Sequence, residues 1–173
     1  MAPPKYTLPE IERRWLVRSH DRPALAGLRR RDIEDQYLSG GRLRLRAVRS
    51  ADTVPVFKLG KKYGRVGAGA EPATTLYLTE QEYLAVQALA GFVVRKARYS
   101  IAGGALDVYE DADPPLTIFE MEFDSHEAAA AFVPPDFVGD EVSLDARYSG
   151  FAIAQAGAPS GVHDKRPNHA EPL

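Results

Sequence analysis

Several segments of this chain alternate charged and apolar residues, and this alternation constrains the fold more than any other feature. In residues 42–50, Arg42, Arg44 and Arg46 are separated by apolar residues. In residues 10–19, Glu10 and Glu12 are separated in the same way. Successive side chains of a β-strand point to opposite faces, so a period of two places the charges of each strand on one face. The chain is therefore predicted to be built largely from strands with one charged face.

Further short segments rich in β-forming residues lie at 54–64, 74–79, 92–101, 104–112 and 116–123. Residues 24–38 predict a short helix that runs into a strand. Thr79 and Glu82 have the spacing of a capping box and predict a helix over residues 80–90. Asp124 and Glu127 predict a second helix, which ends before Pro134. The expected fold class is α+β, mainly antiparallel β, with a few packed helices.

Length, charge and composition exclude several classes of protein. The 173 residues suit one domain, and the 22 basic and 24 acidic residues nearly cancel. No overall field therefore favours nucleic acid or a membrane surface as a partner. The chain has no cysteine, which excludes disulfides and thiolate chemistry. No apolar run approaches the roughly 18 residues of a membrane-spanning helix, and a cytoplasmic location is expected.

The domain boundaries follow from the ends of the chain. Residues 1–8 are expected to be a proline-rich lead-in, and residues 9–155 a single domain. Residues 156–173 are rich in Gly, Pro and polar residues, which is typical of a disordered tail.

The charged faces suggest a function when they are taken together. On one strand, such a face ordinarily meets water. Here Glu10 and Glu12 come from one strand and Glu120 and Glu122 from another, while several other strands carry Arg and Lys. If the sheet closes with these faces inward, carboxylates and fixed cations share one interior, and the helices pack outside against the apolar faces. Carboxylates suit Mg²⁺ or Mn²⁺, and Arg and Lys suit phosphate, so the pattern predicts a site for a metal and a polyphosphate.

Six segments resemble the motifs of a known family. EIERRWLV resembles the Glu-x-Glu-x-Lys motif that opens the CYTH domain, the fold of the triphosphate tunnel metalloenzymes. Five later segments resemble other motifs of the family in its order: DQYLSGGRLRLRAV, FKLGKK, VRKARYS, IFEMEF and SLDARYSGFAIA. The resemblance covers roughly residues 8–155. It implies an eight-stranded antiparallel barrel with a polar-lined tunnel and flanking helices, which hydrolyses a triphosphate with Mg²⁺ or Mn²⁺.

The resemblance also implies roles for individual residues. The expected metal ligands, of which the first three are also expected to be catalytic, are Glu10, Glu12, Glu122, Glu120 and Asp107. The expected phosphate ligands are Arg14, Arg44, Arg46, Lys58, Lys62, Lys96 and Arg98. A water activated by the metal or by a carboxylate is expected to attack the terminal phosphate.

The chain departs from the family pattern at three places. Arg14 replaces the Lys of the opening motif. Thr74 and Thr75 lie where a Glu pair is usual, with Glu71 the nearest acid. Tyr109 replaces the acidic partner of Asp107. These departures leave open whether one metal or two are bound.

Three functions remain open from the sequence. The first is hydrolysis of inorganic triphosphate, a phosphoanhydride hydrolase activity, because no segment indicates a pocket for a base. The second is an adenylyl cyclase or a thiamine or nucleoside triphosphatase. The third is a non-catalytic module that binds polyphosphate or nucleotides. In each case the partner is a small-molecule triphosphate, and the choice between a monomer and a homodimer stays open.

Overall fold

The chain folds mainly into β-strands in the computed structural model, which describes residues 4–64, 71–112 and 115–159. The strands are β1 (Leu8–Glu10), β2 (Glu12–Leu16), β3 (Arg30–Leu38), β4 (Leu43–Ser50), β5 (Thr53–Lys62), β6 (Glu71–Leu78), β7 (Gly91–Ile101), β8 (Gly104–Tyr109) and β9 (Leu116–Glu122). The helices are α1 (Glu80–Gln87), α2 (His126–Ala131), the 3-10 helix η1 (Ala146–Tyr148) and α3 (Gly150–Ala156). The predicted lead-in and tail fall partly on residues 1–3 and 160–173, which lie outside the described residues.

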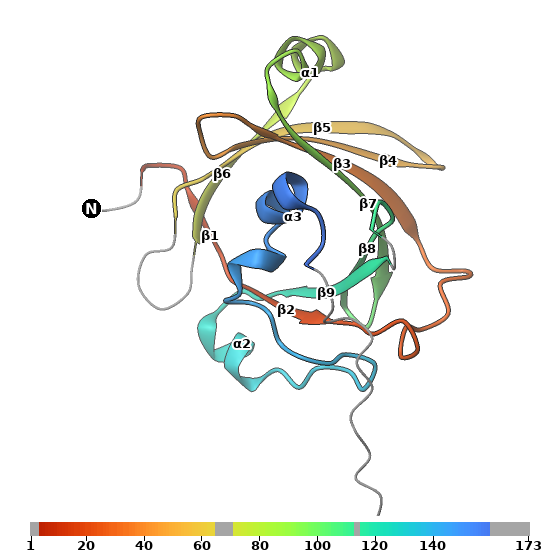
Figure 1. The fold of residues 1–173 in the computed structure, drawn as a ribbon. Helices are drawn as coiled ribbons and strands as arrows, with labels where there is room; N and C mark the ends of the chain where they lie inside the picture. Colours follow the sequence, from red (N-terminus) through yellow and green to blue (C-terminus); the bar gives the residue numbers. More distant parts are fainter. Residues whose placement is uncertain (1–3, 65–70, 113–114, 160–173) are drawn as a thin grey trace, which may run out of the picture.

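All strands belong to one antiparallel sheet with the order β1-β6-β5-β4-β3-β7-β8-β9-β2. The sheet curls into a ring of strands (Figure 1). β1 and β2 stand at its two edges, yet only Ile11 separates them in the chain. The ring is therefore closed by chain continuity, as the predicted barrel requires.

The strand count is nine in the described residues, and the prediction of eight was wrong. The first predicted strand is split at Ile11. Its first part pairs with β6 and its second part with β9. The Ile11 carbonyl accepts a hydrogen bond from the Phe123 backbone N–H at 2.8 Å. The chain thus changes partners at Ile11, which interrupts the strand without opening the ring.

The helix α1 covers the outer apolar face of β4 and β5, as predicted. Leu45, Ala47 and Phe57 pack there with Tyr83 of α1. The capping box is confirmed, because Thr79 Oγ1 accepts from the Glu82 N–H while the Glu82 carboxylate accepts from the Thr79 N–H at 2.7 Å. This side of the barrel follows from local sequence alone.

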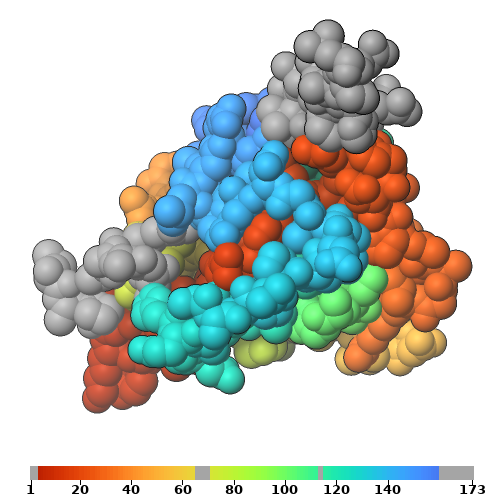
Figure 2. Space-filling view, turned by 90° about the horizontal axis from the view of Figure 1, so that it is seen from below, coloured from red at the N-terminus to blue at the C-terminus, as the bar shows by residue number. Residues whose placement is uncertain are grey.

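A second apolar cluster lies outside β2, β7, β8 and β9, under α2 and the chain that follows it. Trp15, Leu106 and Phe119 are buried there, and the Trp15 and Phe132 ring centroids are 5.6 Å apart. Figure 2 shows the α2 segment and the following chain lying across this side of the molecule. The N-cap of α2 is Ser125, whose hydroxyl accepts from the Ala128 N–H at 3.1 Å, so the prediction of Asp124 was wrong by one residue.

The helix expected before β3 does not form. The described residues 24–29 contain no helix, and Gly27 has a φ of +81°. A left-handed residue interrupts helical geometry, so the chain turns here and enters β3 directly.

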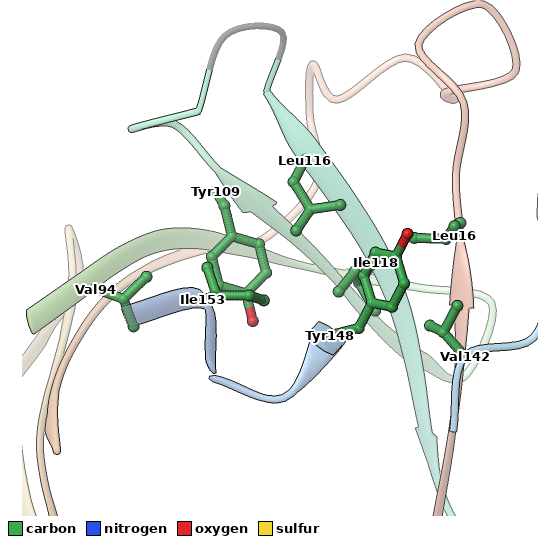
Figure 3. Close-up of a cluster of buried hydrophobic side chains, with 8 residues drawn as sticks. All are labelled: Leu16, Val94, Tyr109, Leu116, Ile118, Val142, Tyr148 and Ile153. Carbon is green, nitrogen blue, oxygen red and sulfur yellow. The ribbon is translucent and has the colours of Figure 1, made fainter. Parts of the chain in front are cut away.

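The third apolar cluster lies inside the barrel, where only charge was predicted. It consists of Leu16, Val94, Tyr109, Leu116, Ile118, Val142, Tyr148 and Ile153 (Figure 3). The strand residues of this cluster continue the inner faces that carry charge farther along the same strands. Figure 1 shows α3 within the ring of strands. The two predicted helices pack outside, as expected, but α3 was not predicted. It lies inside because one end of the interior is apolar and needs an apolar partner.

Replacing Ile153 tests the contribution of this inner cluster. Its side chain is 5% exposed. Ile153→Ala is expected to lower the free energy of unfolding by about 2–5 kcal/mol, because it leaves a cavity between α3 and the barrel wall. Urea unfolding measures the change.

Leu144→Ala is the matched control in the same segment. Leu144 is 82% exposed, and its replacement is expected to change stability by less than about 0.5 kcal/mol. Equal effects of the two substitutions would contradict the inner position of α3.

Candidate functional site

The inner face of the barrel carries charged side chains from every described strand. Residues that are directly opposite in an antiparallel pair share a face, and so do residues two apart along a strand. By this register, the inner charged residues, named here the tunnel cluster, are Glu10, Glu12, Arg14, Arg31, Asp35, Arg44, Arg46, Lys58, Lys62, Glu71, Lys96, Arg98, Asp107, Glu120 and Glu122. Every predicted site residue is in this set, and Arg31, Asp35 and Glu71 are additional members.

Glu12 lies at the centre of the tunnel cluster. Burial acts to raise its pKa, but the positive charges of Lys62, Arg14, Lys96 and Arg44 outweigh burial and hold the pKa of Glu12 below its usual value. Lys62 and Lys96 come from β5 and β7, which are not neighbours of β2 in the sheet. These charges therefore act across the interior, and the side chains converge as the closed barrel requires.

Asp35 is the most important residue that sequence reasoning missed. It is 1% exposed and accepts two hydrogen bonds from Arg46, at 2.6 and 2.7 Å. Burial acts to raise the pKa of Asp35, but Arg46 and Arg44 outweigh it and hold this pKa below its usual value. The alternation of β3 contained the signal, because Asp35 shares a face with Tyr37 of the predicted motif.

Asp107 is a counter-ion for two predicted phosphate ligands. It is fully buried, accepts hydrogen bonds from Arg98 at 2.6 Å through both oxygens, and also pairs with Lys96. Burial alone would raise the pKa of Asp107, but Lys96 and Arg98 hold it well below its usual range. Its predicted metal role would require a metal to displace these cations.

Glu120 differs from the other carboxylates of the cluster. It pairs with Arg98, yet burial and the negative charge of Asp107 raise the pKa of Glu120 above its usual value. Of these carboxyl groups, Glu120 thus holds a proton more readily than Asp107 or Glu12 does.

Lys62 is shared by two acidic residues. Its Nζ lies 2.9 Å from Glu10 and 3.6 Å from Glu71. Burial acts to lower the pKa of Lys62, but Glu12, Glu10 and Glu71 outweigh burial and raise it. Glu71 therefore faces the site in place of the missing Glu pair at Thr74 and Thr75.

Among the predicted phosphate ligands, Arg44 and Lys58 are the cations least committed to carboxylates. Arg44 Nε is 3.8 Å from Asp35 Oδ1, and in the described part of the chain this buried nitrogen has no hydrogen-bond partner. Lys58 Nζ lies 5.0 Å from the centre of the Tyr77 ring, and no ion pair of Lys58 is seen within residues 4–64, 71–112 and 115–159. These two cations can take a phosphate without first losing a strong partner.

Arg14 is held by main-chain carbonyls. Its Nη1 donates to the Tyr148 carbonyl at 2.7 Å and its Nη2 to the Ser143 carbonyl at 3.2 Å. Its predicted role in phosphate binding therefore competes with contacts inside the protein.

The carboxylates fit a divalent ion that is bound together with its substrate. No group of three or more potential ligands is already assembled among the described residues. Glu12 and Glu122 are directly opposite in the β2–β9 pair, which places their Cβ atoms about 4.5–5.5 Å apart. Mg²⁺ is usually held by one or two carboxylates, with waters and substrate phosphates completing its octahedron. The two opposed carboxylates meet that requirement.

The buried carboxylates predict a loss of stability in acid. Asp35 and Asp107 have folded pKa values below the unfolded value of about 3.9. Their ion pairs therefore stabilise the fold fully above that value, and this contribution is lost as the pH falls through the folded values. The free energy of unfolding is expected to begin to fall as the pH drops toward about 4 and to go on falling through the lowered folded pKa values.

Asp35→Asn tests the source of this acid dependence. It is expected to destabilise the fold by about 3–5 kcal/mol at neutral pH, because Arg46 loses its partner, and to flatten the acid slope. Asp52→Asn, at an exposed turn, is the control and is expected to behave as wild type. An unchanged acid slope in the Asp35 variant would contradict the assignment.

Comparisons with known proteins bear on the fold and on the chemistry. No model of a known protein family matches the chain. A stretch of 66 residues is 44% identical to an inorganic triphosphatase from Nitrosomonas europaea, and covers 35% of this chain and 44% of that protein. The match thus spans less than half the length of this curated relative.

Two crystal structures share the fold over most of the chain. Both are of NE1496, which is called an inorganic triphosphatase in one and a hypothetical protein in the other. The first is 27% identical, with a TM-score of 0.56, and the comparison covers 87% of this chain and 97% of that one. The second is 29% identical, with a TM-score of 0.55 over 85% and 98% of the two chains.

Proposed function

We propose that this chain is a member of the CYTH family of triphosphate tunnel proteins, whose motifs its sequence resembles, and that it is a hydrolase that cleaves a phosphoanhydride bond of a triphosphate. The observation that carries the proposal is the convergence of Glu12 with Lys62 and Lys96 from opposite sides of a closed barrel. An interior that holds both carboxylates and cations suits a polyanion that binds together with a metal ion.

Inorganic triphosphate is the proposed substrate. The name inorganic triphosphatase is given both to the similar protein from Nitrosomonas europaea and to the protein NE1496 in the similar crystal structure. In this chain, Arg44 and Lys58 would bind phosphate oxygens first, because they are the least committed cations. Arg44 can form paired hydrogen bonds to phosphate, whereas Lys58 supplies a point charge.

A metal-bound triphosphate would also satisfy groups that now neutralise each other. Glu10 and Lys62 form an ion pair at 2.9 Å. A ligand that carries both a divalent cation and phosphate offers a new partner to each. Binding can therefore replace this ion pair without leaving either charge unpaired.

Mg²⁺ or Mn²⁺ is the proposed cofactor, held by Glu12 and Glu122, with Glu10 as a further ligand. Glu120, which pairs with Arg98, is left for proton transfer. These oxygen donors are the type that both ions prefer. When bound, the ion would offset the negative charge of the phosphate oxygens.

Hydrolysis would proceed by attack of water in line with the bond that breaks. The water oxygen forms a bond to the terminal phosphorus, the bridging P–O bond breaks, and orthophosphate and pyrophosphate leave. The proton of the water needs an acceptor. Glu120 is suited to this role once it is ionised, because a carboxylate with a raised pKa is a stronger base. The surrounding cations stabilise the charge that develops on the phosphate oxygens.

Glu12→Ala tests the proposed function. Phosphate release from inorganic triphosphate with Mg²⁺ or Mn²⁺ is expected to fall at least about 100-fold, because the central carboxylate is lost. Glu80→Ala, at the exposed start of α1, is the control and is expected to keep wild-type activity. Absence of release by wild type with either ion would contradict the proposal.

An organic triphosphate is a second candidate, favoured by Tyr77. Its ring is 72% exposed and lies on the inner side of β6, beside Lys58. An exposed ring next to a phosphate ligand offers a stacking surface for a base or a thiamine ring.

Tyr77→Ala separates the two candidates. If the substrate is organic, KM for thiamine triphosphate or ATP is expected to rise about 5-fold or more, which corresponds to the loss of about 1 kcal/mol of stacking. If it is inorganic triphosphate, the kinetics are expected to stay unchanged. Analysis of the ATP products for cyclic AMP tests the cyclase alternative in the same experiment.

A further inference from the structure

Arg14 makes a set of contacts that the proposed chemistry does not require. The C-terminal segment of residues 142–156, named here the plug, fills the apolar end of the barrel with Tyr148 and Ile153 (Figure 3). The Arg14 guanidinium donates to two carbonyls of the plug, those of Tyr148 and Ser143. Its backbone N–H donates to Ser143 Oγ at 2.9 Å, and its carbonyl accepts from the Val142 N–H at 2.8 Å. Arg14 is therefore bound to the plug through both its side chain and its main chain.

These contacts keep the guanidinium away from a phosphate. Arg14 is 7% exposed, and of its two bonded carbonyls one belongs to Ser143, before η1, and the other to Tyr148, the last residue of η1. Turning the guanidinium toward the centre of the tunnel would break both charge-assisted hydrogen bonds. A Lys at this position has one nitrogen and cannot reproduce the fork that spans Ser143 and Tyr148.

The same side chain also reaches the centre of the site. Arg14 Nε is buried, lacks a hydrogen-bond partner among the described residues, and lies 3.7 Å from Glu12 Oε1. Glu12 and Arg14 share the inner face of β2. One guanidinium thus touches the plug at one end and a carboxylate of the tunnel cluster at the other.

We propose that Arg14 is a positioning residue, which locks the plug into the barrel and orients Glu12, and is not a ligand of phosphate. The locking role stands on the contacts alone. The effect on turnover rests on the proposed function.

Hydrogen exchange of the plug amides tests the locking role without any activity. The N–H of Ile153 in the plug donates to the Ser149 carbonyl at 3.0 Å, and the N–H of Gly157, directly after the plug, donates to the Ile153 carbonyl at 2.9 Å. In Arg14→Lys these amides are expected to exchange at least about tenfold faster than in wild type, because one anchoring hydrogen bond or more is lost. Arg44→Lys, the matched control, is expected to leave their exchange unchanged. Unchanged exchange in Arg14→Lys would overturn the proposal.

Gly150→Ala displaces the plug while Arg14 stays intact. A Cβ at this position would lie 2.0 Å from Tyr37 Oη. This variant is expected to accelerate the same amides as Arg14→Lys does. If Gly150→Ala accelerates exchange of these amides and Arg14→Lys does not, displacing the plug does expose the amides, but Arg14 does not hold the plug in place. The proposal then fails.

NMR of the wild-type chain tests the proposal without any substitution, so the result does not depend on whether a variant folds. Inorganic triphosphate with Mg²⁺ is added while the Nε–H resonances of the arginines are followed by NMR. The Arg44 resonance is expected to shift, and the Arg14 resonance is expected to shift less. A larger shift at Arg14 than at Arg44 would show phosphate contact and overturn the proposal.

Kinetics separate this inference from the proposed function. Arg14→Lys is expected to lower kcat for inorganic triphosphate with less than about a threefold change in KM, whereas Arg44→Lys is expected to raise KM. A rise in KM alone for Arg14→Lys would support phosphate binding and contradict the proposal. If wild type releases no phosphate, the proposed function fails, while the exchange result still decides the role of Arg14.

Discussion

The pairing of Asp107 with Lys96 and Arg98 is the interaction on which the interior of this barrel depends. Charges in the interior of a closed sheet are costly to bury unless hydrogen-bonded groups of opposite charge compensate them. Asp107 is such a partner for two cations of β7, and Asp35 for Arg46 of β4. These pairs leave Arg44 and Lys58 as the least committed of the predicted phosphate ligands. The charge balance of the folded chain therefore separates cations that hold the barrel together from cations that are ready for an anion.

At its apolar end, the barrel must shield hydrophobic side chains from water instead of compensating buried charges. The inner faces of β2 and β9 change from charged residues to Leu16 and Ile118 within one repeat of the alternation. An apolar lining needs an apolar partner, and α3 supplies it from within the ring (Figure 1). Arg14 lies where the two regions meet. The stability of the plug and the geometry of the tunnel cluster are thus linked through one side chain.

Periodicity predicted much of this arrangement and could not predict the rest. The period of two placed Glu12, Arg44 and Lys62 on inner faces, and the Thr79 capping box located α1. Pairing between distant strands has no local signal, so the sequence did not reveal Asp35 as the partner of Arg46. Likewise, the apolar residues of α3 suit packing either inside or outside a barrel, so the sequence could not show on which side this helix lies. The split at Ile11 depends on which strands close the ring, and only the complete sheet determines that.

The most direct test of the central claim is a crystal structure of the chain with inorganic triphosphate and Mn²⁺, read by anomalous scattering. A Mn²⁺ peak is expected between Glu12 and Glu122, with phosphates on Arg44 and Lys58 and with Arg14 still bonded to Tyr148 and Ser143. Triphosphate bound outside the barrel, or an interior without Mn²⁺ at saturating concentrations of both, would show that the tunnel cluster is not the site.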